Sequence, residues 1–329
     1  MKVLVTGGAG YIGSICVRKL CKAGHDVVVV DDLSAGHRQA VLPPARLVVL
    51  NIQDTPTLEK VLAEGRFDAA MHFAASTAVG ESVQQPLKYW RNNTAGTLNL
   101  LEGLQRHNVK RFVFSSTCAV YGDPLKIPLT EDHPKNPVSP YGRSKAAVEW
   151  MLEDSACAWG LGAMALRYFN AAGAADDGAL GEDHDPETHL IPLALQAAAG
   201  LGGRLKVFGT DWPTPDGTCI RDYIHVEDLA EAHLRALEAA QEGVFKYINI
   251  GTGHGASVQE VVRTAEKVTG KPVPHDLAGR RPGDVPTLLA DPSLASRELN
   301  WRAQRTDLEQ IIRSAWQWLQ AHPVGYVGD

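Results

Sequence analysis

The sequence predicts an α/β fold in which a doubly wound parallel sheet is accompanied by a second, smaller α/β domain. Three observations lead to this prediction. Short apolar runs of strand type alternate with helical patterns over the first half of the chain, as βαβ units require. The first apolar run passes directly into a glycine-rich turn, and the second ends in two aspartates. The segment 173–189 is irregular, polar and rich in glycine and acidic residues, which indicates a separate part of the molecule beyond the sheet.

The apolar runs and helical spacings place the elements in order along the 329 residues. The expected strands are residues 3–5, 25–30, 46–50, 67–73, 112–117, 166–170 and 247–250. The expected helices are residues 12–22, 57–63, 89–104, one that opens after Ser139, 190–199, 226–239, 258–270 and 308–319. Such alternation is typical of a Rossmann-type sheet with helices on both faces.

The glycine-rich turn after the first strand is the first candidate for binding chemistry. Gly7, Gly10 and Gly13 would let the backbone approach a pyrophosphate at the N-terminus of the next helix. The second strand ends in Asp31 and Asp32. At Asp31 a carboxylate can accept a hydrogen bond from a ribose 2′-hydroxyl and would repel a 2′-phosphate. The arrangement therefore predicts NAD rather than NADP.

Small or polar residues follow the later strands. Asn51 and Ile52 come after the third strand, well placed to meet an adenine edge. Ala74 and Ala75 follow the fourth, where small side chains leave room for a cofactor in the crevice; a tight contact between strand and helix fits them equally well. Asn92 is a poor residue for a helix interior, which indicates either a polar task or simple exposure to solvent.

The helix that opens after Ser139 carries a tyrosine and a lysine on one face. Ser139 and Pro140 are typical of an N-cap and a first helical position. Tyr141 and Lys145 are four residues apart, so an ammonium and a helix dipole would both favour the phenolate. Taken alone, the pair also fits an ordinary helix surface. The fifth strand ends in three hydroxyls, of which Thr117 could bridge a substrate oxygen and the phenol or merely cap the strand.

Composition excludes several classes of protein. The formal net charge of −6 gives no basic surface for nucleic acid. No stretch approaches the roughly 20 apolar residues of a membrane span, and the first residues do not form a secretory segment. The five cysteines are scattered, without the paired spacing of a metal site, which fits a reducing compartment. We therefore expect a cytoplasmic protein with no metal and with neither nucleic-acid nor membrane partners.

Several motifs, in this order and with compatible spacing, resemble the extended short-chain dehydrogenase/reductase family. They are T-G-G-A-G-Y-I-G-S at 6–14, S-S-T-C-A-V-Y-G at 115–122, S-P-Y-G-R-S-K at 139–145 and R-Y-F-N at 167–170. The motifs R-D-Y-I-H-V-E-D-L-A at 221–230 and R-R-P-G-D-V-P at 280–286 narrow the resemblance to the UDP-glucose 4-epimerases. The resemblance covers nearly the whole chain, from Lys2 to Trp318.

The resemblance implies which residues would contact the cofactor and the substrate. For NAD it implies Gly7, Gly10, Tyr11, Ile12, Gly13, Asp31, Asp32, Asn51, Ile52, Phe73, Ala74, Ala75, Asn92, Tyr141, Lys145, Tyr168 and Phe169. For a UDP-sugar it implies Thr117, Tyr141, Asn170, His189, Leu190, Val207, Phe208, Arg221, Tyr223, Arg281, Asp284 and Leu288. Arg221 and Arg281 would hold the diphosphate.

The same resemblance implies a division of labour between two domains. Residues 1–168 with about 221–250 would bind NAD, and residues 169–220 with 251–329 would bind the UDP-sugar. Thr77 stands where some relatives carry a lysine beside the cofactor, so that contact is not carried over. At Leu288 relatives vary in bulk, which leaves the acceptance of N-acetylated sugars open. A homodimer through the helices that carry Asn92 and Tyr141 is expected.

The implied reaction interconverts UDP-glucose and UDP-galactose. Tyr141 would take the proton of the sugar 4-hydroxyl while hydride passes from C4 to NAD, Thr117 would bond the same oxygen, and Lys145 would lower the pKa of the phenol. The 4-keto sugar would then turn, held by UDP, and hydride would return to its other face.

Other functions fit some of the same motifs. An epimerase of UDP-N-acetylhexosamines stays open, as does a decarboxylase. A dehydratase is disfavoured because Cys118 and Ala119 stand where its acid and base would lie. A non-catalytic NAD sensor is disfavoured because such proteins typically lose the tyrosine or the lysine.

Overall fold

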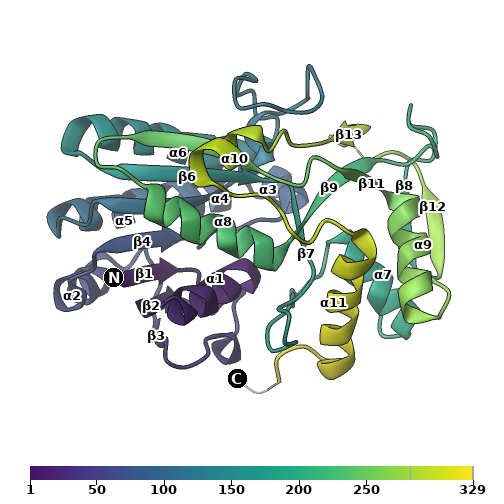
Figure 1. The fold of residues 1–329 in the computed structure, drawn as a ribbon, viewed down its shortest axis with the longest axis horizontal. Helices are drawn as coiled ribbons and strands as arrows, with labels where there is room; N and C mark the ends of the chain where they lie inside the picture. The colour runs from purple at the N-terminus through teal and green to yellow at the C-terminus, as the bar shows by residue number, and fades with distance from the viewer. Residues whose placement is uncertain (282, 328–329) are drawn as a thin grey trace.

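The computed structural model describes residues 1–281 and 283–327 (Figure 1). Pro282, within the motif at 280–286, and the last two residues lie outside the described part. The fold has a large sheet of seven strands, all parallel, in the order β10-β6-β5-β4-β1-β2-β3. A smaller part with its own sheet and helices lies beside the carboxyl ends of these strands, on the right in Figure 1.

The elements of the large sheet match the expected order. Its strands are β1 (Lys2–Thr6), β2 (Asp26–Asp31), β3 (Arg46–Val49), β4 (Ala69–His72), β5 (Arg111–Thr117), β6 (Gly162–Tyr168) and β10 (Phe245–Ile250). The helices that pack on it are α1 (Tyr11–Lys22), α2 (Thr55–Gly65), α5 (Gly96–Arg106), α6 (Pro140–Trp159), α8 (Val226–Ala239) and α10 (Ser293–Leu299). The predicted doubly wound α/β fold is confirmed.

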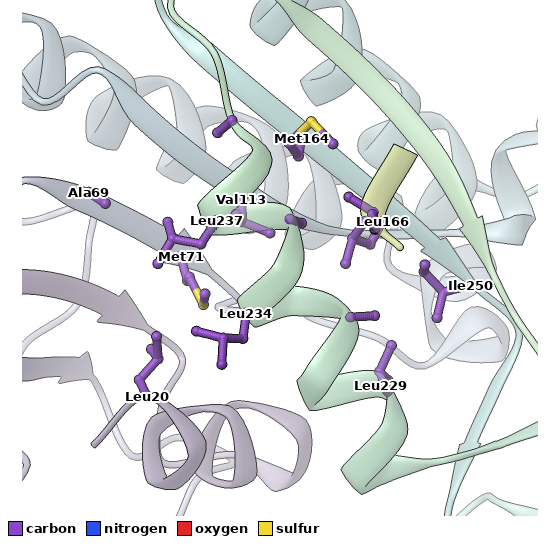
Figure 2. Packing of buried hydrophobic residues seen from close by; sticks show 14 of the residues in the cluster. Leu20, Ala69, Met71, Val113, Met164, Leu166, Leu229, Leu234, Leu237 and Ile250 are labelled. Atoms are coloured by element: carbon purple, nitrogen blue, oxygen red, sulfur yellow. The ribbon is translucent and has the colours of Figure 1, made fainter. Parts of the chain in front are cut away.

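The large sheet has two apolar faces because alternate residues of each strand point to opposite sides. On one face Val3 and Val5 of β1 pack with residues of α1, α8 and α10. Figure 2 shows this layer, with Leu234 and Leu237 of α8 turned toward the strands. On the other face Leu4 packs with residues of α2, α5 and α6. Burial on both faces explains why the strands are nearly continuous apolar runs.

The strand order reverses between β1 and β4, which are hydrogen-bonded neighbours. From β1 the chain winds outward to β2 and β3, and then returns to continue on the other side through β4, β5, β6 and β10. In open sheets of this kind, ligands bind where the winding direction changes, at the carboxyl ends of the strands. The first turn and the end of β4 therefore mark the expected binding edge.

The predicted helix over 89–104 is built in three pieces. α4 (Pro86–Tyr89) passes into a π-helical turn, η2 (Trp90–Ala95), and then into α5. A π-turn inserts one extra residue into the helix, and such turns are frequent at functional sites. Here the turn carries Asn92 and Asn93 toward the end of β4, where both contact Ser76. A separate short helix, α3 (Val79–Gln84), precedes it.

The smaller part contains three helices and two small sheets. β9 (Ile220–His225) pairs with β7 (Asn170–Ala172), β11 (Gly255–Ser257) and β13 (Thr287–Leu288), and β8 (Leu205–Phe208) pairs with β12 (His275–Ala278). α7 (Leu190–Ala199), α9 (Val258–Thr269) and α11 (Leu308–Ala321) share one apolar core. Thus β9 lies in the smaller sheet, whereas α8, β10 and α10 belong to the large one.

One buried carboxylate holds the smaller sheet to the strand ends. Asp222 of β9 is fully buried and accepts hydrogen bonds from the amides of Thr252, Gly253 and Ala290 at 2.9, 3.0 and 3.2 Å. These residues follow β10 and β13, so three distant segments meet at a single side chain. Within the described residues, no helix is both long and apolar enough to cross a membrane.

Candidate functional site

The glycine turn between β1 and α1 leaves no room for side chains. Gly7 has a φ of +74°, and a Cβ there would lie 2.3 Å from the amide nitrogen of Ala74. A Cβ at Gly13 would lie 2.2 Å from the Gly7 carbonyl oxygen. Gly10 caps α1 without any side-chain hydrogen bond, so the amides of the first turn face outward uncapped. This is the cradle that a pyrophosphate needs at a helix N-terminus.

The acids at the end of β2 lie beside this turn. Asp31 is buried and accepts hydrogen bonds from the amides of Ala9 at 3.0 Å and Leu33 at 2.9 Å. Burial raises the pKa of Asp31, and these two bonds lower it in part. Asp32 accepts a hydrogen bond from the side-chain amide of Asn51 at 2.7 Å. Of the residues predicted to hold an adenosine, the acids and Asn51 are thus brought together.

Ile52 and Asn92 lie at the same edge as Asn51. Ile52 is buried, and a Cβ at Gly96 of α5 would lie 3.1 Å from its side chain. Asn92 donates to the Ser76 hydroxyl at 3.1 Å. An open pocket of about 240 Å³ lies here, lined by Ser34, Gln53, Ser76, Lys88, Arg91 and Asn92. Lys88 and Arg91 are cations at this edge that the sequence patterns did not single out.

The end of β5 and the start of α6 bring the predicted catalytic residues together. The Ser139 hydroxyl accepts from the Gly142 amide at 3.1 Å, so the predicted N-cap is present. This cap fixes Tyr141 in the first turn, where its phenol lies close enough to the hydroxyl of Thr117 for that hydroxyl to lower its pKa in part. The Lys145 ammonium donates to the Ser115 carbonyl at 2.8 Å. Hydroxyl, phenol and ammonium therefore converge on one strand end.

Burial governs the acidity of these groups. Burial raises the pKa of Tyr141 to about 12, although the hydroxyl of Thr117 lowers it in part. Burial also lowers the pKa of Lys145 to about 7. Among the protein's own groups burial outweighs any lowering of the phenol pKa, and the lowering by Lys145 stays a prediction. The Lys145 ammonium itself donates to the Ser115 carbonyl and lies 4.7 Å from the centroid of the Phe114 ring.

The remaining residues predicted to contact the cofactor lie around this strand end. Tyr168, at the end of β6, exchanges a hydrogen bond with the Ser115 hydroxyl. Phe169 follows it and packs near Cys118 in a shared apolar cluster. Phe73 follows β4 and packs against His233 of α8, with ring centroids 4.8 Å apart. The Tyr11 hydroxyl donates to the Gly173 carbonyl at 2.6 Å, which joins the glycine turn to the smaller part.

A buried ion pair under this site was not predicted from the sequence. Arg167 of β6 and Glu149 of α6 are both fully buried and form a two-bond pair. Glu149 also accepts from the Ser116 hydroxyl at 2.7 Å, and Arg167 donates to the Tyr121 hydroxyl at 2.9 Å. The pair therefore ties α6 to β5 and β6 one residue from Thr117. The feature of the sequence that could have indicated this pair is an arginine flanked by apolar residues of a predicted strand.

The smaller part brings the predicted diphosphate residues together. Arg221 of β9 donates to the carbonyls of Ile220 and Val285, both at 2.9 Å, and lies 3.7 Å from Asp284. Arg281 donates to the same carboxylate at 3.0 and 3.2 Å. The guanidinium of Arg281 also lies 5.5 Å from the ring centroid of Phe208. The side chain of Arg221 is 15% exposed and that of Arg281 59%, so only the first is enclosed.

The two halves of the site meet through the loop after β5. Burial raises the pKa of Cys118 to about 12, and the nearby Arg221 lowers it in part. Cys118, Phe169 and Leu288 belong to one apolar cluster with Ala146 of α6. Leu288 also pairs with Arg221 in the register of β13 and β9. The structure thus places the predicted sugar-pocket residue between α6 and Arg221.

Some predicted substrate residues are positioned by the core of the smaller part. Val207 and Tyr223 are buried in that core, and Leu190 packs against it. Asn170 opens β7 and pairs with Tyr223 in the register of β9. His189 is the N-cap residue of α7 but gives no side-chain cap. Its imidazole instead meets the carboxylates of Glu182 and Glu187, at 2.9 and 3.0 Å.

Known proteins share both the sequence and the fold of this chain. A model of the NAD dependent epimerase/dehydratase family matches residues 3–251. A UDP-glucose 4-epimerase of Azospirillum brasilense is 50% identical over 318 residues, which cover 96% of this chain and 91% of the relative. The UDP-glucose 4-epimerase of Corynebacterium glutamicum is 47% identical over 321 residues, 98% of this chain and 96% of the relative.

Solved structures agree with these relatives. The crystal structure of UDP-glucose 4-epimerase from Brucella ovis in complex with NAD superimposes with a TM-score of 0.92 at 48% identity, covering 96% of this chain and 97% of that one. The enzyme from Bifidobacterium longum, in complex with NAD+ and UDP, gives a TM-score of 0.95 at 38% identity, with 99% and 100% coverage.

Proposed function

Because the chain belongs to the NAD dependent epimerase/dehydratase family, we propose that it interconverts UDP-glucose and UDP-galactose. One observation carries the proposal: the phenol of Tyr141, in the first turn of α6, lies beside the buried hydroxyl of Thr117 at the end of β5. The same strand end faces the enclosed cation of Arg221 across the Cys118 loop. A proton relay beside a diphosphate anchor is what the epimerisation of a nucleotide sugar requires.

The residues at the winding reversal of the sheet fit NAD. The uncapped first turn of α1 and the close backbone packing at Gly7 and Gly13 suit a pyrophosphate. Asp31 keeps a carboxylate at the end of β2, which suits a ribose with two free hydroxyls. We assign NAD to the part built on the large sheet and the UDP-sugar to the smaller part. Bound NAD would supply the acceptor and donor of hydride at sugar C4 and, when oxidised, a positive charge.

In this proposal the chain's own groups move the proton and hold the sugar nucleotide. Tyr141 takes the proton of the 4-hydroxyl and later returns it, so the same phenol works as base and then as acid. Thr117 bonds the same oxygen and keeps the phenol in position. Lys145, buried and held by the Ser115 carbonyl, adds a cation beside the relay and holds the nicotinamide ribose.

The substrate side is anchored at its nucleotide end. Arg221 and Arg281 offer planar donors to the two phosphates, with Asp284 holding both guanidinium groups in place. The sugar meets Leu288 and few other groups with fixed positions. Strong anchoring of UDP with weak contacts to the sugar allows the 4-keto sugar to turn and present its other face.

An assay without added reductant tests the proposed activity. Purified protein loaded with NAD is given UDP-galactose, and the UDP-glucose formed is measured by a coupled enzyme. Interconversion in both directions is the expected result. Binding of UDP-glucose without any interconversion would contradict the proposal. A panel of UDP-sugars with and without the N-acetyl group then defines the substrate range, in which UDP-N-acetylhexosamines are the second candidates.

We propose that the protein works as a homodimer in the cytoplasm. The helices around Asn92 and Tyr141 expose large apolar side chains: Val83 is 65% exposed, Leu87 74% and Trp150 52%. Such a surface is typical of a protein contact. The five cysteines are free thiols, which fits a reducing compartment. Light scattering should give twice the chain mass, and Leu87→Asp should give a monomer; a monomeric parent protein would refute the dimer.

A further inference from the structure

The segment between β7 and α7 gathers four side chains of metal-ligand type. Glu182, His184, Glu187 and His189 each direct one oxygen or nitrogen to the same point, and these four atoms lie within 4.8 Å of one another. They come from eight consecutive residues, with the spacing E-x-H-x-x-E-x-H. The epimerase chemistry proposed above uses none of the first three.

The distances within the cluster are short enough for the four side chains to share one small cation, and the shorter ones are also those of hydrogen bonds. Zinc bonds of about 2.0–2.1 Å to nitrogen and oxygen place neighbouring ligand atoms about 3.4 Å apart. Nδ1 of His184 lies 3.4 Å from Glu182 and 3.5 Å from Glu187. Nδ1 of His189 lies 2.9 Å from Glu182 and 3.0 Å from Glu187. Each imidazole therefore stands at ligand distance from both carboxylates.

Burial makes a cation necessary at this point. The side chains of Glu182 and Glu187 are each only 6% exposed. Oε1 of Glu182 and Nδ1 of His184 are buried and, among the described residues, make no hydrogen bond of good geometry, although imidazole nitrogens lie 2.9 and 3.4 Å from this oxygen. Buried carboxylates are tolerated only when a charge or a metal compensates them. The unsatisfied oxygen and nitrogen both belong to the cluster and thus point to a ligand there.

We propose that Glu182, His184, Glu187 and His189 bind one divalent transition ion of the zinc type. Two imidazoles and two carboxylates are ligands that zinc takes, and two carboxylates balance the charge of one divalent ion. Because the chain supplies all four ligands, the site is closed and structural rather than catalytic. It goes beyond the proposed function, since no step of the epimerisation passes through it.

The competing arrangement is a metal-free ion cluster. Burial by itself lowers the pKa of His184 and His189, but the two carboxylates raise it to about 9 and about 10. Two imidazolium ions would then balance two carboxylates, and a divalent ion would have to replace two protons. Both arrangements are electrically neutral, so only a direct measurement of metal separates them.

The metal would fasten the substrate side to the cofactor side. His189 is the residue directly before α7, and His184 packs edge-on against the ring of Tyr11, with centroids 6.3 Å apart. Tyr11 is the first residue of α1, directly after the glycine turn. Its hydroxyl donates a hydrogen bond to the carbonyl of Gly173, at the start of the segment. The proposal assigns the imidazole of His189 to the metal and leaves its backbone for the nucleotide.

The test is metal binding by the NAD-loaded protein after chelation and dialysis. Zn²⁺ is titrated with calorimetry and elemental analysis, and Co²⁺ is used as a spectroscopic substitute. We expect one equivalent per chain and the intense visible absorption of tetrahedral Co²⁺. In both His184→Ala and the isosteric Glu182→Gln, affinity should fall by more than about 100-fold. His107→Ala is the matched control, since His107 pairs with the single carboxylate of Glu59 at 2.7 Å; it should bind metal as the parent does.

Three results would overturn the proposal. The first is no binding of Zn²⁺ at micromolar concentrations to folded protein. The second is an unchanged amount of bound metal, one equivalent per chain, in both His184→Ala and Glu182→Gln. The third is a thiolate charge-transfer band with Co²⁺, which would place the ion on one of the five cysteines. Circular dichroism confirms that each variant is folded, and because Glu182→Gln preserves shape, a loss of metal in it cannot be ascribed to a lost fold.

Discussion

The cofactor side and the nucleotide-sugar side of the proposed site are built in opposite ways. On the cofactor side the backbone defines the geometry: Gly7 and Gly13 pack against neighbouring backbone atoms, and Asp31 is held by two amides. On the other side, charged side chains from separate loops hold one another, as Arg221 and Arg281 share the carboxylate of Asp284. The first side is set by local chain geometry, whereas the second exists only in the folded protein.

The difference teaches which changes each side should tolerate. A backbone cradle survives most substitutions outside its glycines, because its donors are amides. An arrangement of charged side chains loses its geometry when one member is removed, since the others are left without a partner. Substitutions in the proposed proton relay of Tyr141 and Thr117, which lies between the two sides, should lower turnover while the binding of NAD and of UDP is unchanged.

Tyr141→Phe should have the largest effect. It removes the phenol hydroxyl while the ring and both binding sides remain. We expect turnover to fall by about 10²–10⁴-fold, with retention of NAD and UDP unchanged. A coupled assay measures turnover, and calorimetry measures UDP binding. Tyr247→Phe on β10 is the control. Near-normal turnover in Tyr141→Phe would remove the phenol from the mechanism.

Substitution of the two arginines compares an enclosed cation with an exposed one. Arg221 is held by two carbonyls, and a charge-assisted bond from it should contribute about 1.5–3 kcal/mol. Arg221→Met should therefore raise the KM for UDP-glucose by roughly 10–100-fold. Arg281→Met should raise it only several-fold, because exposed pairs contribute about 0–1 kcal/mol.

Neither arginine variant should release NAD, which spectroscopy of the purified protein can check. Equal effects on KM from the two substitutions would show that the exposure of the guanidinium does not decide its contribution. Loss of NAD from either variant would show that the two sides are not independent.

Leu288→Ala tests which sugar the substrate side accepts. The substitution removes three carbons from the cluster that joins Cys118 and Phe169, next to Arg221 in the β9 register. The added room should raise the ratio of kcat/KM for UDP-N-acetylglucosamine to that for UDP-glucose by about tenfold relative to the parent protein. Competing assays with both substrates measure this ratio. Leu277→Ala, at an exposed position of β12, is the control, and an unchanged ratio in Leu288→Ala would place the acetyl group elsewhere.

The large sheet should also show a distinctive response to acid. Burial and, to a smaller extent, the charge of Lys145 lower the pKa of His72 to about 3; burial lowers that of His233 to about 4. Both are neutral when folded and ordinarily titrate near 6.5. Below about pH 6.5 the unfolded chain takes up protons that the folded chain excludes, so stability falls as pH falls.

Each histidine should contribute a slope of up to about 1.4 kcal/mol per pH unit. Denaturant unfolding from pH 7 to 4 measures it. His72→Asn and His233→Asn should each reduce the slope over this range, since both histidines stay neutral in the folded protein down to about pH 4. A parent protein whose stability does not change over this range would contradict the burial of neutral histidines.

The fold and the cofactor side were predictable because short spacings determine them. The seven strands, the glycine turn and the acids of β2 can be assigned from periodicity and from spacing within about 30 residues, as βαβ units allow. The small sheet could not be, since β7, β11 and β13 have only two or three residues each and pair through long-range contacts. Their short runs carry no recognisable period.

The chemistry of buried groups was the least predictable part. The raised pKa of Tyr141 depends first on its burial, and the lowered pKa of Lys145 depends on burial as well, which a motif does not contain. The ion pair of Glu149 and Arg167 joins residues 18 positions apart on a helix and a strand. The roles carried over for His189 and Val207 stay predictions, although the structure turns both side chains toward partners within the protein.

The path of the chain limits how such a protein could be recombined. After β6 the chain enters the smaller part, returns at α8, leaves after β10, returns at α10 and leaves again before α11. The smaller part, to which we assign the UDP-sugar, is thus not one continuous segment of the chain. A chimera with one crossover between residues 222 and 252 would set Asp222 from one parent against the loops of Thr252 and Ala290 from another. We therefore expect point substitution to change the smaller part with less disturbance than the exchange of a whole segment.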